Sequence, residues 1–372
     1  MDSNLRRYAY LKNYIKKAPR LSYLFLELTN KCNLKCSHCG SSCPENKNYS
    51  MLKAERIIPV MDEIMKKTSP SNMMFCITGG EPFLNPEWYE ICEHIHQSGF
   101  LWGVTTNGTL FTPQLVEQLA DAGMSTISIS IDGDKASHEK LRNVDGCYQK
   151  TIDAVYLLLE AKKFKSVQIT TVISTLNIDQ LNSMYSQFER MGISSWKLTT
   201  IEPIGEARKN KDLFLKKEQL LYLLEFIREK RLNSRMDVTF GCNHFLTMQY
   251  DDQVRKGHFF CGAGVFIASI TSEGNIKACL DIDDRKSIQG NISEDNFWDV
   301  WMHRFEIFRK DRNLKNEVLS RIKKDLNDMV KIDEELNEEL KEVIQQFNTI
   351  YGPPGAFGIE PYEMGIISDD II

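Results

Sequence analysis

The sequence predicts an α/β fold: a partial (βα)6 TIM-like barrel with a small C-terminal extension made of a β-hairpin and helices. From residue 21 onward, short runs of β-branched and aromatic residues alternate with longer segments of helical periodicity. This alternation is typical of a parallel sheet covered by helices. After residue 236 it stops, and alternating apolar residues around a short turn indicate a hairpin instead. A closed eight-stranded barrel is the alternative architecture.

Six strands and six helices alternate in the predicted barrel. The strands are expected at 23–28, 73–78, 102–106, 126–131, 167–173 and 196–200. The helices are expected at 52–67, 86–98, 113–122, 148–161, 178–191 and 216–231. Pro86 and Pro113 suit the first turn of a helix, whereas Gly99, Gly123 and Gly192 fall where helices are expected to end. In such a barrel, we expect the chemistry at the carboxyl ends of the strands.

These patterns divide the chain into four expected segments. They are a basic helical segment at 1–20, the barrel at 21–236, the hairpin region at 237–312, and a charged helical segment with an irregular tail at 313–372. The hairpin is predicted within 268–280, where Glu273, Gly274 and Asn275 form the turn. The charged segment carries apolar residues at helical spacing, and the tail is rich in glycine and proline.

Composition and charge exclude several classes of protein. The chain has 372 residues, of which 42% are hydrophobic and 26% charged, so it can bury a large core. A net charge of -5 disfavours sequence-independent binding of nucleic acid. The basic start lacks the apolar core of a secretory signal, and no stretch is long and apolar enough to cross a membrane. We therefore expect a cytoplasmic protein, in which the ten cysteines serve as metal ligands, catalytic thiols or packing residues rather than disulfides.

A cysteine-rich loop directly follows the first predicted strand. Cys32, Cys36 and Cys39 form the pattern CxxxCxxC, and three thiolates on one short loop can hold three corners of a [4Fe–4S] cluster. A structural zinc site is disfavoured because no second CxxC pair occurs in the chain. A closed ferredoxin-type cluster would add Cys43, which precedes Pro44, but the first spacing of that motif needs two residues where this chain has three.

Polar residues follow the later strands at the points where these strands end. The carboxyl ends of parallel strands meet at the same mouth of a barrel, so we expect these side chains to lie together. Adjacent glycines after the second strand would also let a ligand approach the backbone closely. The residues concerned are Gly79, Gly80, Glu81, Asn107, Ser130, Asp132, His138 and Arg142, with Asn177 and Glu202 as further candidates.

Together, the CxxxCxxC loop, the GGEP sequence and the TNG and SxDG segments resemble the motifs of the radical S-adenosylmethionine (SAM) superfamily. The resemblance implies that three cysteines hold a [4Fe–4S] cluster whose fourth iron is chelated by SAM. The implied ligands are Cys32, Cys36 and Cys39, with Cys43 as a bystander. His38 stands where the family usually has an aromatic residue that touches the adenine.

The resemblance also implies roles for the strand-end residues. The GGEP motif would bind the amino group of SAM, the TNG segment would line the cofactor, and Ser130 and Asp132 are candidates for its ribose. Arg142 is the candidate for its carboxylate. The reduced cluster would cleave SAM to a 5′-deoxyadenosyl radical that abstracts hydrogen from a substrate. A low-potential electron donor of the flavodoxin or ferredoxin type is then implied as a partner.

A second group of cysteines lies in the hairpin region. Cys261, Gly274 and Cys279 form C-x12-G-x4-C, which resembles the opening half of the SPASM or twitch extension that carries auxiliary clusters. No cysteine follows Cys279, so at most one auxiliary cluster is expected, with Cys242 as its third ligand. The candidates for a fourth ligand are Asp281, Asp283, Asp284 and His258. Alternatively, these cysteines only pack the hairpin.

Three functions follow from these motifs. The first is a radical SAM enzyme that modifies a ribosomally made peptide. It would form a crosslink or a thioether, or epimerise a residue. The second is a dehydrogenase or cofactor-pathway enzyme that acts on a small molecule. The third is a non-catalytic electron carrier, which would need Cys43 as a fourth cluster ligand. Sulfatase maturation is disfavoured because Leu280 stands where those enzymes carry an aspartate.

Overall fold

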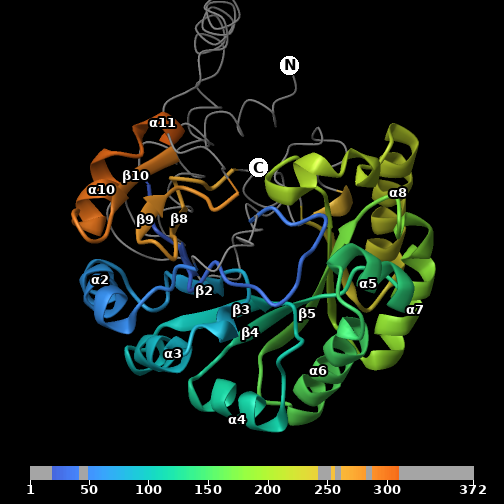
Figure 1. Cartoon of the computed structure of the whole chain (residues 1–372), viewed down its shortest axis with the longest axis horizontal. Helices are drawn as coiled ribbons and strands as arrows, with labels where there is room; N and C mark the ends of the chain where they lie inside the picture. Colours follow the sequence, from blue (N-terminus) through green and yellow to red (C-terminus); the bar gives the residue numbers. More distant parts are fainter. Residues whose placement is uncertain (1–18, 42–48, 242–252, 256–260, 282–286, 310–372) are drawn as a thin grey trace, which may run out of the picture.

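The computed structural model describes residues 19–41, 49–241, 253–255, 261–281 and 287–309. These residues form one curved sheet whose outer face is covered by helices (Figure 1). The strand order is β10-β9-β8-β1-β2-β3-β4-β5-β6-β7. In this order, neighbouring strands pair in parallel from β8 to β7, whereas β9 is antiparallel to both β8 and β10.

Strands and helices alternate along the barrel as the sequence predicts. The strands are β1 Tyr23–Glu27, β2 Met74–Thr78, β3 Leu101–Thr106, β4 Thr126–Ser130, β5 Ser166–Ile173, β6 Ser195–Thr200, β7 Asp237–Phe240, β8 Ile267–Ile270, β9 Asn275–Lys277 and β10 Ile288–Asn291. The helices are α2 Ala54–Lys67, α3 Trp88–Gln97, α4 Pro113–Asp121, α5 Lys135–Arg142, α6 Cys147–Ala161, α7 Leu181–Met191, α8 Lys217–Asn233, α10 Phe297–His303 and α11 Glu306–Arg309. Short 3-10 turns occur at η1 Pro82–Leu84, η2 Ile178–Gln180, η3 Gly205–Lys209 and η4 Lys211–Leu213.

The parallel part of the sheet is longer than the six strands we expected. β7 pairs with β6 at one edge, and β8 pairs with β1 at the other, where Tyr23 lies opposite Ile267. The predicted hairpin is confirmed as β8 and β9, but it continues the barrel sheet instead of forming a separate element. Backbone hydrogen bonds from Arg20 and Ser22 to carbonyls at 265 and 266 extend the contact beyond β1. This edge pairing was not visible in the sequence, because it joins segments more than two hundred residues apart.

Side chains on the sheet alternate between an apolar outer face and a polar inner face. In β4, Ile127 and Ile129 are buried in the hydrophobic core, whereas the intervening residues are only half-buried. On the inner face, the hydroxyls of Ser128 and Thr170 lie 2.7 Å apart, and the Gln168 amide contacts both. The helices therefore pack against aliphatic side chains, while the interior of the barrel presents hydrogen-bonding groups.

None of the helices in the described part of the chain is long and apolar enough to span a membrane. The predicted segments 1–20 and 313–372 lie almost wholly outside the described residues, as does Cys43. Helix α5 was not predicted. Its N-cap residue is Asp134, whose side chain accepts a hydrogen bond from the Ser137 backbone N–H at 2.9 Å.

The fully buried side chain of Asn85 joins three segments near the mouth of the barrel. Its Nδ2 donates to the carbonyls of Leu28 and Leu52 at 2.8 Å each, and its Oδ1 accepts from the Glu87 backbone N–H at 2.9 Å. Asn85 thereby ties the end of β1 to the segment before α2 and to the start of α3. Without the Asn85 side chain, each of these buried backbone groups would lose a hydrogen bond.

We expect Asn85→Ala to lower the free energy of unfolding by about 3 kcal/mol, because it removes three buried hydrogen bonds at once. Urea unfolding followed by circular dichroism measures the change. Asn182→Ala is the matched control, since this asparagine is exposed on α7. Equal stability of the two variants would contradict the anchoring role of Asn85.

Candidate active site

The cysteine loop follows β1 and is held by hydrogen bonds from two other elements. The backbone N–H groups of Lys35 and Ser37 donate to the carbonyls of Arg142 and Leu141 at 3.2 and 2.8 Å. The Asn210 Nδ2 donates to the Ser37 carbonyl at 2.9 Å from the other side. The end of α5 and the η3 turn therefore position the loop, in which the three predicted cluster ligands lie.

Gly79 and Gly80 hold the start of the same loop against the end of β2. The N–H of Gly80 donates to the Thr29 carbonyl at 2.7 Å, and the N–H of Glu81 donates to the Lys31 carbonyl at 2.8 Å. A Cβ on Gly80 would lie 2.3 Å from the Lys31 oxygen, and one on Gly79 would lie 2.4 Å from the Thr29 oxygen. We expected these glycines to admit a ligand, but the chain's own backbone already requires them.

A cavity of about 790 Å³ lies between the cysteine loop and the strand ends. Its volume is within the range of small-molecule sites. It is lined by Cys32, Lys35, Cys36, His38, Cys39, Thr78, Gly79, Gly80, Thr105, Thr106, Asn107, Ser130, Arg142, Asn143, Thr170, Val172, Glu206, Lys209, Asn210 and Asp281, among others. The structure thus brings together all three CxxxCxxC thiols and most of the predicted strand-end residues.

The three thiols lie close enough to influence one another. The pKa of the Cys36 thiol is raised to about 12. Burial is the largest cause, and Cys39 and Cys32 also raise this pKa, whereas the Arg142 guanidinium lowers it. Within the described residues, no three Cys, His, Asp or Glu side chains are close enough together to bind a single metal ion. Three cysteines around one cavity fit a larger iron–sulfur group, which would bind them as thiolates and displace their protons.

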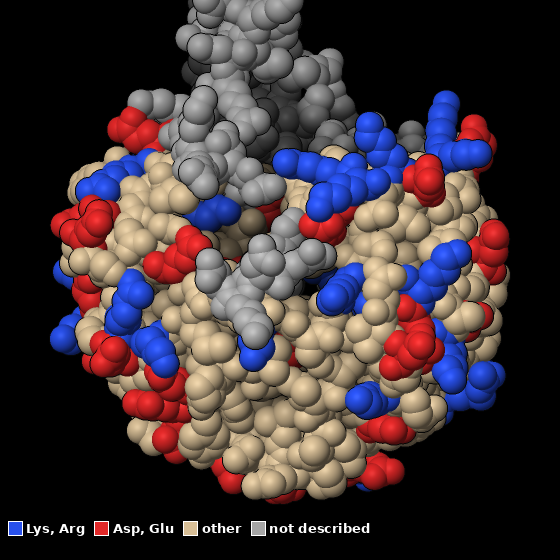
Figure 2. Space-filling view, viewed as in Figure 1, with Lys and Arg blue, Asp and Glu red and all other residues tan. Residues whose placement is uncertain are grey.

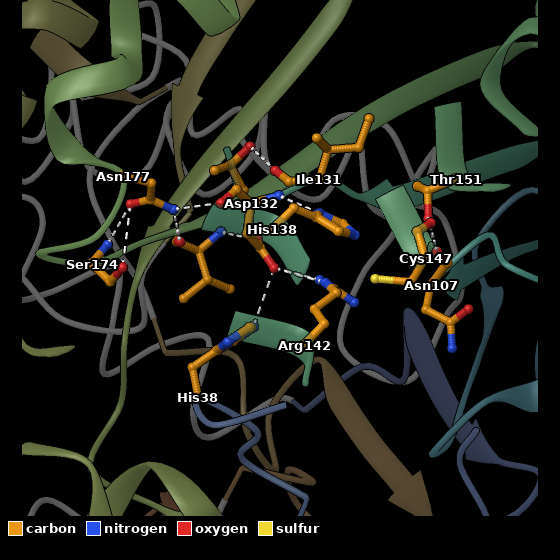
Figure 3. Close-up of polar contacts among 12 residues, drawn as sticks. His38, Asn107, Ile131, Asp132, His138, Arg142, Cys147, Thr151, Ser174 and Asn177 are labelled. Atoms are coloured by element: carbon orange, nitrogen blue, oxygen red, sulfur yellow. Dashed lines mark hydrogen bonds and ion pairs between the residues drawn. The ribbon is translucent and has the colours of Figure 1, made fainter. Parts of the chain in front are cut away.

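A buried ion pair between Asp132 and Arg142 lies beside the cavity (Figure 3). The Arg142 Nε and Nη2 donate to the Asp132 Oδ2 at 2.9 and 2.6 Å, and the Val172 N–H donates to Oδ1 at 2.9 Å. Burial alone would raise the pKa of the Asp132 carboxyl, but the Arg142 charge, with a smaller contribution from His38, holds that pKa well below its usual value. The carboxylate is therefore ionised and its oxygens are occupied by protein groups.

His38 connects this ion pair to the cysteine loop. Its Nε2 lies 3.3 Å from the Asp132 Oδ2, and its side chain is only 7% exposed. Figure 3 shows the His38 ring directed at the Asp132 carboxylate. His38 also lines the cavity, as predicted for the residue at this position of the motif.

The chain around Asp132 is fixed by two further buried side chains. The His138 Nδ1 accepts the Asp132 backbone N–H at 3.1 Å, and burial, with the Arg142 charge, lowers the pKa of His138 to about 3. Asn177 donates through Nδ2 to the carbonyls of Asp132 and Val172 and accepts the Ser174 N–H. Both side chains hold the ends of β4 and β5, and neither lines the cavity.

Glu81 is fully buried behind the glycine pair. Its two carboxylate oxygens accept hydrogen bonds from the Thr106 hydroxyl at 2.8 Å and the Asn107 N–H at 2.9 Å. Burial nevertheless raises the pKa of this carboxyl to about 7, because the two hydrogen bonds only partly offset the loss of solvation. Glu81 therefore holds the end of β3 next to the end of β2.

Glu81 and Asp132 were expected to contact SAM, and this stays a prediction. In the structure neither residue lines the cavity, and both carboxylates are bonded within the protein. Arg142 lines the cavity while it binds Asp132. The sequence placed these residues at the right end of the barrel but could not reveal that the carboxylates bind neighbouring strand ends.

The segment after β6 also contributes to the cavity and was missed. Glu206, Lys209 and Asn210 line it, together with Lys35 of the cysteine loop. The sequence contained a signal for this contribution to the cavity. A polar and basic run follows the sixth strand, and the carboxyl end of that strand lies at the mouth of the barrel.

The second cysteine group is only partly described. Cys261 and Cys279 lie near each other, and Asp281 both lines the cavity and accepts a hydrogen bond from the Cys279 thiol at 3.8 Å. Burial raises the pKa of Cys279 to about 12, with further increases from Asp281 and Cys261. The other candidate ligands, Cys242, His258, Asp283 and Asp284, lie outside the described residues.

Residues 26–188 match the model of the Radical SAM superfamily. The AdoMet-dependent heme synthase of Methanosarcina barkeri is 26% identical over 311 residues, which cover 80% of this chain and 85% of that protein. The mycofactocin maturase MftC of Mycolicibacterium smegmatis is 28% identical over 290 residues, which cover 77% of this chain and 71% of that protein. Residues 26–188 therefore form a Radical SAM domain.

Solved structures agree with this assignment at the level of the fold. The Streptococcus suis protein SuiB bound to S-adenosylmethionine aligns with a TM-score of 0.65 at 16% sequence identity, over 94% of this chain and 79% of SuiB. The protein anSMEcpe with bound AdoMet aligns with a TM-score of 0.62 at 21% identity, over 78% of this chain and 82% of that one. A Radical SAM domain implies a [4Fe–4S] cluster and SAM as cofactors.

The raised pKa of Glu81 predicts a pH dependence of stability in this radical SAM enzyme. The unfolded carboxyl titrates at 4.5 and the folded one at about 7, so the folded protein retains a proton that the unfolded chain loses between these values. The stability that this proton provides is present below the unfolded pKa and is lost as the pH rises through the folded pKa. Between pH 4.5 and about pH 7, the free energy of unfolding of the wild type should fall by roughly 3 kcal/mol relative to that of Glu81→Gln.

Urea unfolding of both proteins at a series of pH values measures this difference. The glutamine can accept the Asn107 N–H through its carbonyl oxygen while its amide donates to the Thr106 hydroxyl, so the variant keeps both contacts. Parallel pH profiles for the two proteins would contradict the prediction.

The ion pair predicts that Asp132→Asn strongly lowers the stability of the protein. This substitution keeps the shape of the side chain and removes its charge. The Arg142 guanidinium would then be buried without a counter-charge, so the free energy of unfolding should fall by about 3 kcal/mol. The matched control is Asp153→Asn on α6, where the side chain is exposed and the expected change is within about 0.5 kcal/mol. Urea unfolding of both variants separates these outcomes, and a change in Asp132→Asn no larger than in the control would refute the prediction.

Proposed function

We propose that this radical SAM enzyme modifies a ribosomally made peptide, forming a crosslink or a thioether or epimerising a residue. The observation that carries the proposal is the 28% identity with mycofactocin maturase MftC, a peptide maturase, over most of both chains. The C-x12-G-x4-C pattern of the hairpin region supports it, because this pattern resembles extensions found in peptide-modifying members. A SuiB structure with its precursor peptide SuiA shares the fold.

In this proposal, Cys32, Cys36 and Cys39 bind the [4Fe–4S] cluster through their thiolates. When bound, the cluster supplies one electron and SAM supplies the 5′-deoxyadenosyl radical that abstracts a hydrogen atom. The rest of the site positions these cofactors. Asn107, Ser130 and the glycine pair would line SAM, since all four lie on the cavity wall.

Arg142 and His38 give the site its electrostatic environment. Both lie on the cavity wall and both contact Asp132, so neither side chain can turn away without breaking a buried contact. We assign the carboxylate of SAM to the neighbourhood of Arg142 and its adenine to that of His38. The ionised Asp132 fixes the orientation of both side chains and excludes water from the space behind them.

Asp281 lies on the cavity wall, and the Cys279 thiol donates a hydrogen bond to it. We include one auxiliary iron–sulfur cluster at Cys261, Cys279 and Cys242 in the proposal, with Asp281 as the candidate fourth ligand. The supporting observation is that Cys279 lies next to both Cys261 and Asp281.

A second candidate is a radical SAM enzyme that acts on a small molecule of the heme pathway. The relatives named AdoMet-dependent heme synthase favour it, since the M. barkeri protein aligns over 85% of its own length. Lys35 and Lys209 on the cavity wall would suit a substrate with carboxylate groups.

Co-expression tests the proposal. The enzyme is produced anaerobically together with a short peptide encoded beside its own gene, and the peptide mass is measured before and after proteolysis. We expect loss of hydrogen mass for a crosslink or thioether, or incorporation of deuterium from heavy water without other mass change for epimerisation. An unmodified peptide, with turnover of a heme precursor by the same preparation, would refute the peptide proposal and support the second candidate.

Cysteine variants provide the controls. Replacing Cys32, Cys36 and Cys39 by alanine should abolish both modification and SAM cleavage. Cys43→Ala should leave both unchanged, because three thiolates suffice in the proposal. Loss of the cluster in Cys43→Ala would instead indicate a closed four-cysteine site, as in an electron carrier.

A further inference from the structure

Exposed cations gather beside the mouth of the barrel, although the protein as a whole is acidic. Five exposed side chains, Arg208, Lys209, Lys211, Lys216 and Lys217, lie on the segment between β6 and the first turn of α8, and we call them the basic rim. The same stretch, 205–218, also carries Glu206, Asp212 and Glu218, so its five cations and three carboxylates leave a net charge of +2, against -5 for the whole chain. Figure 2 shows Lys and Arg side chains grouped on the α8 side of the mouth.

The basic rim is attached directly to the cysteine loop. The N–H of Ala207 donates to the Cys39 carbonyl at 3.4 Å, and Asn210 donates to the Ser37 carbonyl. A Cβ on Gly205 would lie 2.6 Å from the Cys39 oxygen, so the two segments pack backbone against backbone. The part of this segment that carries Arg208, Lys209 and Lys211 therefore packs against the third cysteine of the motif.

Several of these charges are available to a partner. Within the described part of the chain, Lys211, Lys216 and Lys217 form no ion pair, whereas Lys209 is paired with Glu206 at 2.9 Å. Leu221 lies one helical turn after Lys217 on the same face of α8 and is 43% exposed. An apolar side chain beside cations provides a contact centre with a charged border, which is the usual arrangement of a protein interface.

We propose that the basic rim is the docking surface for an acidic, low-potential electron-carrier protein of the ferredoxin or flavodoxin type. The inference rests on the proposed function, because only a resident cluster beside Cys39 would need an electron at this place. In the transfer, the iron or flavin of the carrier loses one electron and the cluster of this protein gains it. No bond forms or breaks at the docking surface. Opposite charges speed such encounters and make their affinity depend on salt.

A binding measurement tests the proposal without relying on turnover. The dissociation constant of an oxidised, acidic two-cluster ferredoxin for the full-length protein is measured by microscale thermophoresis at low and at physiological ionic strength. Lys211→Glu/Lys217→Glu is the test variant, since neither residue lines the cavity and a glutamate suits the first turn of α8. We expect this variant to weaken binding by about tenfold at low salt, and added salt to weaken binding of the wild type.

The matched control is Lys66→Glu/Lys67→Glu, which makes the same charge change at the end of α2. That end of the helix lies at the amino edge of the strands, away from the mouth, and the control should bind ferredoxin as the wild type does. Equal affinity of the test variant and the wild type, or equal loss in both variants, would overturn the proposal. A test variant that binds ferredoxin normally but binds the peptide substrate more weakly would also overturn it, and would assign the rim to the substrate.

SAM cleavage driven by dithionite distinguishes this failure from failure of the proposed function. Dithionite needs no docking surface, so the wild type and the test variant should cleave SAM equally with it, while ferredoxin-driven cleavage should fall in the test variant alone. Absence of dithionite-driven cleavage in the wild type would refute the proposed function itself.

Discussion

The buried ion pair between Asp132 and Arg142 is the interaction on which the arrangement of the barrel mouth depends. Asp132 follows β4, and Arg142 is the last residue of α5, so the pair fixes this helix against the strand end. The last carbonyls of α5 then accept the N–H groups of Lys35 and Ser37 and thereby hold the cysteine loop. Because an unpaired charge would be costly in this buried position, the helix and the loop have little freedom to move apart.

Several strand ends at the mouth are bound to their neighbours by buried hydrogen bonds. The Glu81 carboxylate joins β2 to β3, the Asp132 carboxylate joins β4 to β5 through the Val172 N–H, and Gly80 joins β2 to the end of β1. The cavity wall carries thiols, hydroxyls, amides, glycine backbone and cations, together with the carboxylates of Glu206 and Asp281. In the structure, the acidic residues of the motifs hold neighbouring strand ends together.

Periodicity and turn residues were sufficient to predict six of the parallel strands and the helices α2, α3, α4, α6, α7 and α8, because each of these shows its pattern locally, but they missed β7 and α5. The CxxxCxxC spacing likewise identified the cysteine loop, and the strand-end rule placed Ser130, Asn107 and Arg142 at the cavity. Edge pairing of β8 with β1 could not be predicted, since it depends on contacts between distant segments. Nor could the sequence show that Glu81 would be buried, because burial depends on how the cysteine loop folds over the glycine pair.

The central claim is that three cysteines hold a cluster whose remaining iron binds SAM. Electron paramagnetic resonance of the anaerobic, dithionite-reduced protein tests it directly, with spectra recorded before and after SAM is added. The account predicts the signal of a reduced [4Fe–4S] cluster that changes when SAM binds and is absent when Cys32, Cys36 and Cys39 are replaced by alanine. A cluster signal that persists in this triple variant, or that does not respond to SAM in the wild type, would contradict it.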